Sequence, residues 1–295
     1  MHDVIIVGGS YAGLSAALML ARARRDVLII DGGNRRNRFA GHSHGFLTQD
    51  GVPAADIAAL GRAQVQTYPT VTWLDAETSD ATAIDSGFAI TAGGQRHEAR
   101  RVLLAIGLSD DLPAIPGLAE RWGTSVFHCP YCDGYELNQG SIGVLAVSAM
   151  SMHHALMLPD WGKTTFFLNG SFEPDADQLA QLDARGVIVE RTPVVRLEGD
   201  RAGMVLADGR RIDVEGLFTA TRIRPSSPIA GQLGCVMEEG PTGPYVSTDA
   251  MKMTSVPGVF ACGDIAKPFG SVAQAVGDGN FTGASVHRTL MFGLS

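Results

Sequence analysis

The stretch DVIIVGGSYAG, residues 3–13, decides the fold. Residues 3–7 predict a short buried strand, and the glycine turn is followed by a helical run with leucines and alanines on one face. Residues 27–30, VLII, predict a second strand that ends at Asp31. Strand, glycine turn, helix and strand form a βαβ unit, whose crossover implies a parallel sheet buried on both faces.

The turn itself reads Gly8-x-Ser10-x-x-Gly13, an imperfect form of G-x-G-x-x-G. Glycines let the backbone approach a pyrophosphate, and the helix N-terminus offers it free N–H groups. Asp31 ends the second strand, where an acidic side chain can accept hydrogen bonds from ribose hydroxyls. Ser10 departs from the pattern but is small. We expect a dinucleotide-binding turn, with an ordinary βαβ turn as the alternative.

The composition describes a globular protein with an acidic surface. The chain has 295 residues, 45% of them hydrophobic and 18% charged, and a formal net charge of −8. An acidic chain argues against a nucleic-acid groove, which would need a basic face. The first ten residues lack the basic start of a signal peptide, and no apolar run reaches the length of a membrane span. We therefore expect a cytoplasmic protein without a membrane segment.

Two segments rich in proline and glycine, residues 111–117 and 238–244, predict domain boundaries. Between them a second βαβ series begins, with a strand at 141–147, a helix at about 149–159 and a strand at 164–168. After the second boundary come a strand at 258–262 and a helix at about 271–290. The sequence thus predicts an α/β protein in which a domain of residues 114–240 is inserted into one formed by residues 1–113 and 241–295.

The segment HCPYCDG, residues 128–134, places Cys129 and Cys132 two residues apart. In a cytosolic-looking chain, a CxxC pair favours redox catalysis or metal binding over a structural scaffold. A four-cysteine zinc site usually needs a second close pair, whereas Cys235 and Cys262 are 27 positions apart. We expect a redox-active dithiol and no metal site; zinc and a purely structural disulfide are the alternatives.

The order of these features resembles the low-molecular-weight thioredoxin reductases over nearly the whole chain. The matching features are the glycine turn, both boundaries, the CxxCDG segment and SVPGVFACGDI at 255–265. The resemblance implies two Rossmann-like nucleotide-binding domains, a homodimer, and FAD bound at the first turn. It also implies that Gly263 and Asp264 contact the ribityl–phosphate region, and that Gln274 and Ala275 lie under the flavin ring. A helix cap is the alternative role for Asp264.

The same resemblance assigns roles at the dithiol. Cys132 faces the flavin and passes it two electrons, while Cys129 exchanges with the incoming thiol or disulfide. A thiolate is the nucleophile in that exchange, so its proton must be removed near neutral pH. Asp133 is the implied acid and base. His128 either assists or is a structural imidazole.

The second nucleotide turn is degenerate. Thioredoxin reductases carry G-x-G-x-x-A for NADPH here, followed by basic residues for its 2′-phosphate. This chain has Ala146, Ser148 and Ser151 at those positions. Beyond the next strand it reads FFLNGSFE, without an arginine to clamp a phosphate. We expect no productive NADPH site, and a packed helix with a polar edge at residues 150–154.

A flavin and a dithiol without a nicotinamide site lack the usual electron source. Either electrons enter from another donor, such as ferredoxin, or the electrons flow in the reverse direction. In reverse, a substrate dithiol reduces the CxxC disulfide and O₂ reoxidises the flavin to give H₂O₂. That scheme resembles the FAD-dependent oxidases that close the disulfides of gliotoxin, holomycin and romidepsin, although those often have His where this chain has Asp133. The stretch GHSHGFLTQDG at 41–51 also resembles that branch, and His42, His44 and Phe46 could border the flavin or substrate.

We therefore expect oxidation of a small-molecule dithiol to an intramolecular disulfide, with a romidepsin-like depsipeptide as the substrate guess. A reductase of thioredoxin or a similar protein, fed by NADPH or another donor, is the alternative. A non-catalytic flavin redox sensor is the third interpretation, which multiple-turnover O₂ uptake with a dithiol would exclude.

Overall fold

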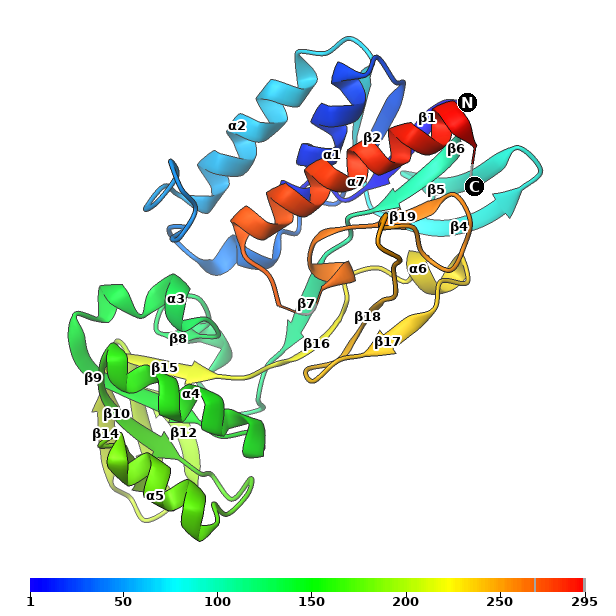
Figure 1. The fold of residues 1–295 in the computed structure, drawn as a ribbon. Coiled ribbons are helices and arrows are strands. Elements are labelled where there is room, and N and C mark those ends of the chain that lie inside the picture. Colours follow the sequence, from blue (N-terminus) through cyan, green and yellow to red (C-terminus); the bar gives the residue numbers. More distant parts are fainter. Residues whose placement is uncertain (268, 294–295) are drawn as a thin grey trace.

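The computed structural model describes residues 1–267 and 269–293. Figure 1 shows two α/β domains joined by a two-stranded ribbon, β7 (Leu108–Asp111) and β16 (Arg222–Pro225). The ribbon strands pair antiparallel, so the chain leaves the first domain along β7 and returns along β16. Two Rossmann-like sheets, the second inserted into the first, confirm the expected fold class.

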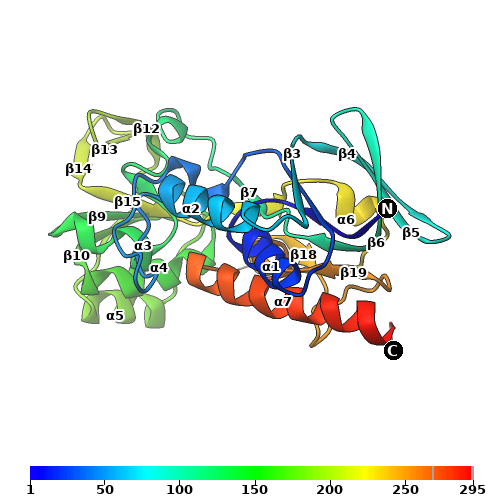
Figure 2. The same ribbon diagram turned by 90° about the horizontal axis from the view of Figure 1, so that it is seen from above.

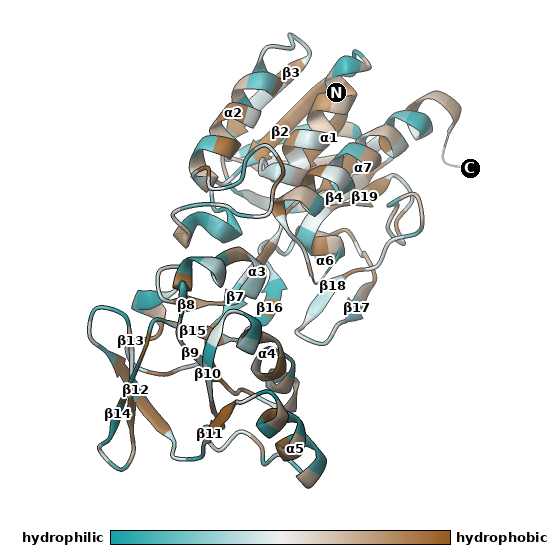
Figure 3. Cartoon of the chain, turned by 60° about the vertical axis from the view of Figure 1, so that its left-hand side comes forward, coloured by the Kyte–Doolittle hydropathy of each residue, from teal (hydrophilic) through white to brown (hydrophobic). Residues whose placement is uncertain are grey.

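The first domain is built on a sheet of order β3-β2-β1-β6-β5-β4, with β19 paired to β6. Its central strands pair parallel and are buried because they are apolar on both faces, as Ile5, Ile29 and Leu103 illustrate. Figure 3 shows brown, hydrophobic colour on β2 accordingly. The strands are β1 (His2–Val7), β2 (Val27–Asp31), β3 (Val71–Asp75), β4 (Thr78–Ile84), β5 (Gly87–Ala92), β6 (Gln95–Leu104) and β19 (Val259–Ala261).

Three helices cover this sheet: α1 (Tyr11–Arg22), α2 (Ala54–Gln66) and α7 (Val272–Phe292). Figures 1 and 2 show α7 lying beside α1. Glycines on α7 allow this close approach, since a Cβ on Gly279 would strike the carbonyl of Ala12 and one on Gly283 would lie 2.7 Å from that of Ala16. The C-terminal helix therefore packs directly on the helix that follows the glycine turn.

The inserted domain has a parallel sheet of order β11-β10-β9-β15-β8. A separate three-stranded antiparallel sheet, β12-β13-β14, packs beside it through its own apolar cluster. The strands are β8 (Val126–Phe127), β9 (Gln139–Leu145), β10 (Gly162–Phe167), β11 (Ile188–Glu190), β12 (Val194–Glu198), β13 (Ala202–Leu206), β14 (Arg211–Val214) and β15 (Gly216–Thr219).

Short helices complete both domains. The inserted domain carries α3 (Pro130–Asp133), α4 (Met152–Met157) and α5 (Ala176–Ala184), with 3₁₀ turns η2 (Ala119–Arg121), η3 (Tyr135–Leu137), η4 (Ala149–Ser151) and η5 (Leu158–Asp160). The first domain carries η1 (Arg36–Phe39) and η6 (Gly263–Ala266). Within the residues described, no helix combines the length and apolarity needed to cross a bilayer.

The return to the first domain comes earlier than the expected boundary at residue 240. Ile223, Ile229 and Val246 are buried in the same apolar cluster as Ile5. The segment after Thr221 therefore packs with the first domain, because its apolar residues complete that core. It contains β16, α6 (Ile229–Gln232), β17 (Met237–Glu239) and β18 (Pro244–Val246).

Candidate active site

A cavity of about 280 Å³ lies between the glycine turn, the start of α7 and the CxxC segment. Gly8 and Ser10 line it, and Asp31 stands at its edge with Oδ1 accepting the Gly9 N–H at 3.0 Å. Gly8 has φ +105°, and a Cβ there would strike the Ala105 carbonyl. Gly8 thus lets the turn pack closely against Ala105, and Ser10, Tyr11 and Ala12 at the start of α1 line the cavity, where helix N–H groups suit a bound pyrophosphate.

Gly13 packs against the backbone of the turn, because a Cβ at this position would strike the carbonyl of Gly8. It lets α1 begin directly against the turn rather than lining the cavity itself. This is the role expected of the last glycine of a dinucleotide-binding turn.

A further part of the cavity wall comes from the C-terminal part of the first domain. Gly263, Asp264 and Ala275 line the cavity, whereas Gln274 lines a small adjoining pocket. The Gly263 N–H donates to Asp278 Oδ2 at 2.9 Å, so the backbone of this turn is held by α7.

Polar groups of the cavity that have no hydrogen-bond partner in the described part of the chain suit a dinucleotide such as FAD. Arg35 lines it, and the Arg35 Nε atom is buried without a hydrogen-bond partner among the described residues. A buried unpaired donor is costly unless a ligand satisfies it. Together with the N–H groups in the first turn of α1, which the Ser10 side chain does not cap, this provides a donor set for a phosphate-bearing group.

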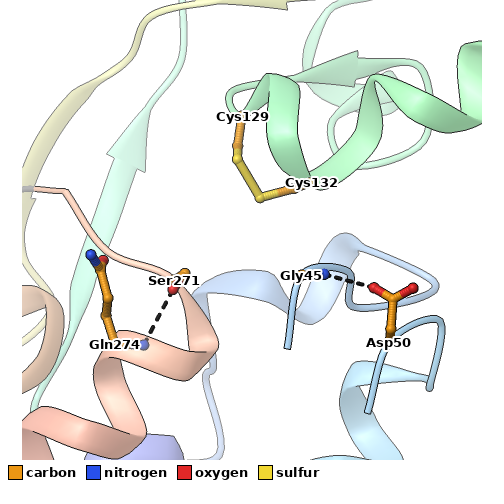
Figure 4. The surroundings of a disulfide bond; sticks show 6 residues. All are labelled: Gly45, Asp50, Cys129, Cys132, Ser271 and Gln274. Carbon is orange, nitrogen blue, oxygen red and sulfur yellow. Dashed lines mark hydrogen bonds between the residues drawn. A yellow bond between two sulfur atoms is a disulfide. The ribbon is translucent and has the colours of Figure 1, made fainter. Parts of the chain in front are cut away.

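Cys129 and Cys132 are joined by a disulfide and line the same cavity. Cys129 precedes the short helix α3, with Pro130 at its first position, where the missing proline N–H costs nothing. Figure 4 shows the disulfide pointing away from α3, toward the side on which Ser271 and the Gly45–Asp50 loop lie. The structure therefore brings the predicted dithiol and the predicted cofactor turn to one space.

Asp133 also lines the cavity, one residue after Cys132. Burial, reinforced by the negative charge of Glu136, raises the pKa of Asp133 to about 6, and His44 acts against this rise. A carboxyl that titrates near neutral pH can both take up and release a proton beside the dithiol.

Two histidines of the inserted domain, one of them the residue before Cys129, pack edge-to-face. The ring centroids of His128 and His154 are 6.1 Å apart. Burial, aided by Arg36, lowers the pKa of His128, and burial lowers that of His154 to about 4. His128 lines the cavity, and its buried Nδ1 has no partner among the described residues. It therefore presents a neutral imidazole rather than a cation next to Cys129.

The loop 41–51 of the first domain reaches the dithiol. His42 and His44 line the cavity, whereas Phe46 lies outside its lining. His44 Nε2 is 3.4 Å from Glu136 Oε1 on η3, and its Nδ1 is 3.6 Å from Asp50 Oδ1. The loop thus bridges the domains beside Asp133.

The second nucleotide turn is closed on itself. Ser151 Oγ, fully buried, accepts the Val147 N–H at 3.1 Å, and Ser148 Oγ accepts the Met150 N–H at 3.3 Å. These are backbone groups that a phosphate would otherwise use. The hydroxyls therefore both occupy space and bind two of the N–H donors of the turn, and Ala146 is buried.

Sequence reasoning missed a buried ion-pair network at the cavity. Arg36 donates from Nε and Nη2 to both carboxylate oxygens of Asp110 at 2.7 and 2.6 Å, and from Nη1 to Asp264 at 3.0 Å. The signal available was NRRNRF at 34–39, a basic run in an acidic chain. Its partners are more than 70 residues away, which no local pattern reveals.

Comparison with known proteins agrees with this geometry. The model of the pyridine nucleotide-disulphide oxidoreductase family matches residues 2–279. A Claviceps purpurea protein named thioredoxin reductase tcpT is 31% identical over 99% of this chain and 95% of its own. The crystal structure of an oxidoreductase from Agrobacterium tumefaciens is 56% identical over 99% of both chains, with a TM-score of 0.96. That of HlmI is 37% identical over 98% of this chain and 92% of its own, with a TM-score of 0.91.

Members of the matching family that share this thioredoxin-reductase-like fold bind FAD. The family match covers the glycine turn, the dithiol and the Gly263–Asp264 turn, so it includes every wall of the cavity described above. This chain belongs to the pyridine nucleotide-disulphide oxidoreductase family.

Proposed function

We propose that this protein is an FAD-dependent dithiol oxidase, which converts a small-molecule dithiol to an intramolecular disulfide and reduces O₂ to H₂O₂. One observation carries the proposal. The disulfide shares a cavity with the dinucleotide turn of the first domain, while the Val147 and Met150 N–H groups of the second turn are bound by the hydroxyls of Ser151 and Ser148.

The dithiol chemistry follows from thiol–disulfide exchange. One substrate thiolate attacks Cys129 Sγ, which breaks the Cys129–Cys132 bond and leaves Cys132 as the thiolate. The second substrate thiolate then attacks the sulfur bound to Cys129. This attack forms the substrate disulfide and leaves both protein cysteines reduced. Two electrons and two protons have then passed from the substrate.

The proton transfers fall to Asp133. Its ionised carboxylate can accept a proton from a substrate thiol, and its pKa of about 6 lets it release that proton again near neutral pH. His44 and Glu136 set this balance from opposite directions. His128, neutral and facing the cavity, is a second acceptor next to Cys129.

FAD would be held by Gly8 and Ser10 at the pyrophosphate, by Asp31 at the ribose, and by Gly263 and Asp264 at the ribityl chain. Gln274 and Ala275 complete the set by the resemblance described above. When bound, FAD supplies the acceptor for the electron pair of the Cys129–Cys132 dithiol and a route to O₂. The residues here orient it and keep the dithiol at the same cavity.

The substrate class is a small molecule bearing two thiols, and we retain a romidepsin-like depsipeptide as the specific example. The resemblance to the gliotoxin, holomycin and romidepsin oxidases supports this choice. The loop 41–51 supports it as well, because His44 approaches Glu136 and brings the first domain up to the dithiol. We also propose a homodimer that acts in the cytoplasm.

Reduction of thioredoxin or a similar disulfide is the second candidate. Asp133, rather than a histidine, follows the second cysteine, as in the reductases. Such an activity would need electrons from NADPH at the altered turn or from another donor.

The deciding experiment is anaerobic. The purified flavoprotein is mixed with NADPH and, separately, with dithiothreitol, while the flavin absorbance is followed. We expect only the dithiol to bleach the flavin, and air to restore the colour with H₂O₂ formed. Rapid bleaching by near-stoichiometric NADPH would overturn the proposal and establish the reductase.

A further inference from the structure

The segment η1 of the first domain contacts both the ribbon and the inserted domain. At its start, the Arg36 guanidinium forms the two-pronged ion pair with Asp110 on β7. Asp110 is in turn bound by Thr221, whose Oγ1 donates to Oδ1 at 2.6 Å. The chain passes between the domains along β7 and returns along β16, and Thr221 lies just before β16. The Asp110 carboxylate therefore contacts both connecting segments.

The ion pair is well placed to fix geometry. The Asp110 side chain is only 8% exposed and that of Arg36 is 23% exposed. A planar guanidinium that binds both oxygens of a carboxylate fixes orientation as well as distance. Hydrogen bonding with Arg36 lowers the pKa of Asp110 although burial acts to raise it, so the pair stays ionised.

At its other end, η1 abuts the inserted domain. Gly123 has φ +79°, and a Cβ at Gly123 would lie 2.6 Å from Phe39 Cβ and 2.7 Å from the Phe39 carbonyl carbon. Only glycine permits so close an approach of the two chain segments. Gly123 follows η2 and lies six residues before Cys129 on the same domain.

This orientation has a functional consequence. The cavity is lined by Cys129 and Cys132 but by none of residues 146–151, which form the second nucleotide turn. An electron donor bound at that turn could reach the cavity only if the domains turned relative to each other. A dithiol oxidase needs no such movement, because its disulfide already faces the cavity.

We propose that η1 is an interdomain lock, in which Arg36 holds Asp110 on the ribbon while Phe39 bears on Gly123, and that it positions the dithiol at the flavin site. Its catalytic consequence rests on the proposed function, whereas the fixed orientation does not. Arg36, Phe39, Asp110 and Gly123 are thus positioning residues.

Two variants test the two ends of the lock, each with a matched control. Asp110→Asn removes the ion pair, and Asp111→Asn removes the neighbouring exposed pair with Arg224. Gly123→Ala adds the clash with Phe39, and Gly170→Ala carries a similar left-handed φ, +67°, with no atom within 4 Å. The holoproteins are compared by small-angle X-ray scattering, by FAD affinity and by anaerobic flavin bleaching with dithiothreitol.

We expect Asp110→Asn and Gly123→Ala each to broaden the interdomain distance distribution and to slow bleaching by about 10- to 100-fold, the cost of a misplaced reacting group. Asp110 and Gly123 line the cavity, so FAD affinity is measured for each variant and bleaching is compared at saturating FAD. Both controls should behave like the unmodified protein. The Gly123 variant keeps the test decisive if Asp110→Asn does not fold.

Unchanged scattering in both lock variants would overturn the lock, whether or not bleaching slows. Changed scattering with normal bleaching would overturn the positioning role. If dithiothreitol bleaches no protein, including the unmodified one, while scattering still changes in the lock variants, the oxidase proposal fails and the lock stands.

Discussion

His44 of the first domain lies 3.4 Å from Glu136 of the inserted domain, measured from Nε2 to Oε1. Both residues act on Asp133, which burial and Glu136 drive toward a higher pKa while His44 opposes them. The pKa of Asp133, which we propose as the acid–base group of the dithiol, is therefore set by residues of both domains. The titration of Asp133 therefore reports the contact between the two domains as well as the burial of its own carboxyl.

The first prediction concerns this titration. The rate of anaerobic flavin bleaching by a dithiol should rise with pH through a midpoint near the Asp133 pKa of about 6, because the carboxylate is the base. Glu136→Gln removes a negative charge and should move the midpoint to lower pH. His44→Asn removes the side chain that lowers the Asp133 pKa and should move the midpoint to higher pH.

The exposed, distant Glu173→Gln serves as the control and should leave the midpoint in place. Stopped-flow absorbance over a pH series gives each value. Shifts of both variants in the same direction, or an unchanged midpoint in Asp133→Asn, would contradict the assignment of the base.

A second prediction follows for stability. The pKa of Asp133 is raised from 3.8 to about 6 in the folded protein, so the folded state holds more protons than the unfolded state between these values. Its contribution to stability is complete below the unfolded pKa and is lost as pH rises through about 6. The loss is on the order of 3 kcal/mol.

Urea unfolding of the native protein and of Asp133→Asn, from about pH 4 to about pH 8, measures this term as a difference. The native protein should lose stability relative to the variant as pH rises. A difference that does not vary with pH would show that the carboxyl is not buried as described.

The sequence predicted the elements better than the connections between them. The βαβ unit at residues 3–31 and the CxxC segment were placed correctly, because apolar periodicity and glycine turns are local signals. The end of the inserted domain lay near Thr221 rather than residue 240. The glycines and prolines at 238–244 form the turn between β17 and β18. Their composition resembles that of a linker, but the apolar residues on either side are buried in the core of the first domain.

The site was predicted where it follows motifs and missed where it follows tertiary contacts. Arg36 and Asp110 meet across 74 positions, and Phe39 meets Gly123 across 84. Neither pair shares a period or a motif. The lost glycines led us to predict no productive NADPH site at the second turn. The bonds from its Val147 and Met150 N–H groups to Ser151 and Ser148 depend on side-chain rotamers that only the folded turn defines.

The third prediction tests that closed turn. Ser151→Ala removes the buried acceptor of the Val147 N–H and should destabilise the protein by about 1–3 kcal/mol, since the donor is left unpaired. Ser148→Ala exposes the Met150 N–H to water and should cost less, within about 1 kcal/mol. Urea unfolding compares the two. Equal small effects would show that the hydroxyls do not hold the turn.

The last prediction separates the two cysteines. Cys129→Ser and Cys132→Ser should each abolish peroxide formation from a dithiol while FAD stays bound, because one cysteine alone cannot take up an electron pair as a disulfide. Cys235→Ala is the control, since that thiol is buried beside Thr254, outside the cavity lining, and burial raises its pKa.

Intact mass spectrometry then assigns the roles. Offered an oxidised substrate, Cys132→Ser should retain it as a mixed disulfide on Cys129, because the thiol that would release it is missing. Cys129→Ser should retain little if, as the family resemblance implies, Cys132 faces the flavin rather than the substrate. Trapping by Cys129→Ser alone would reverse the assignment while keeping the dithiol mechanism. Normal turnover by either variant would exclude that mechanism altogether.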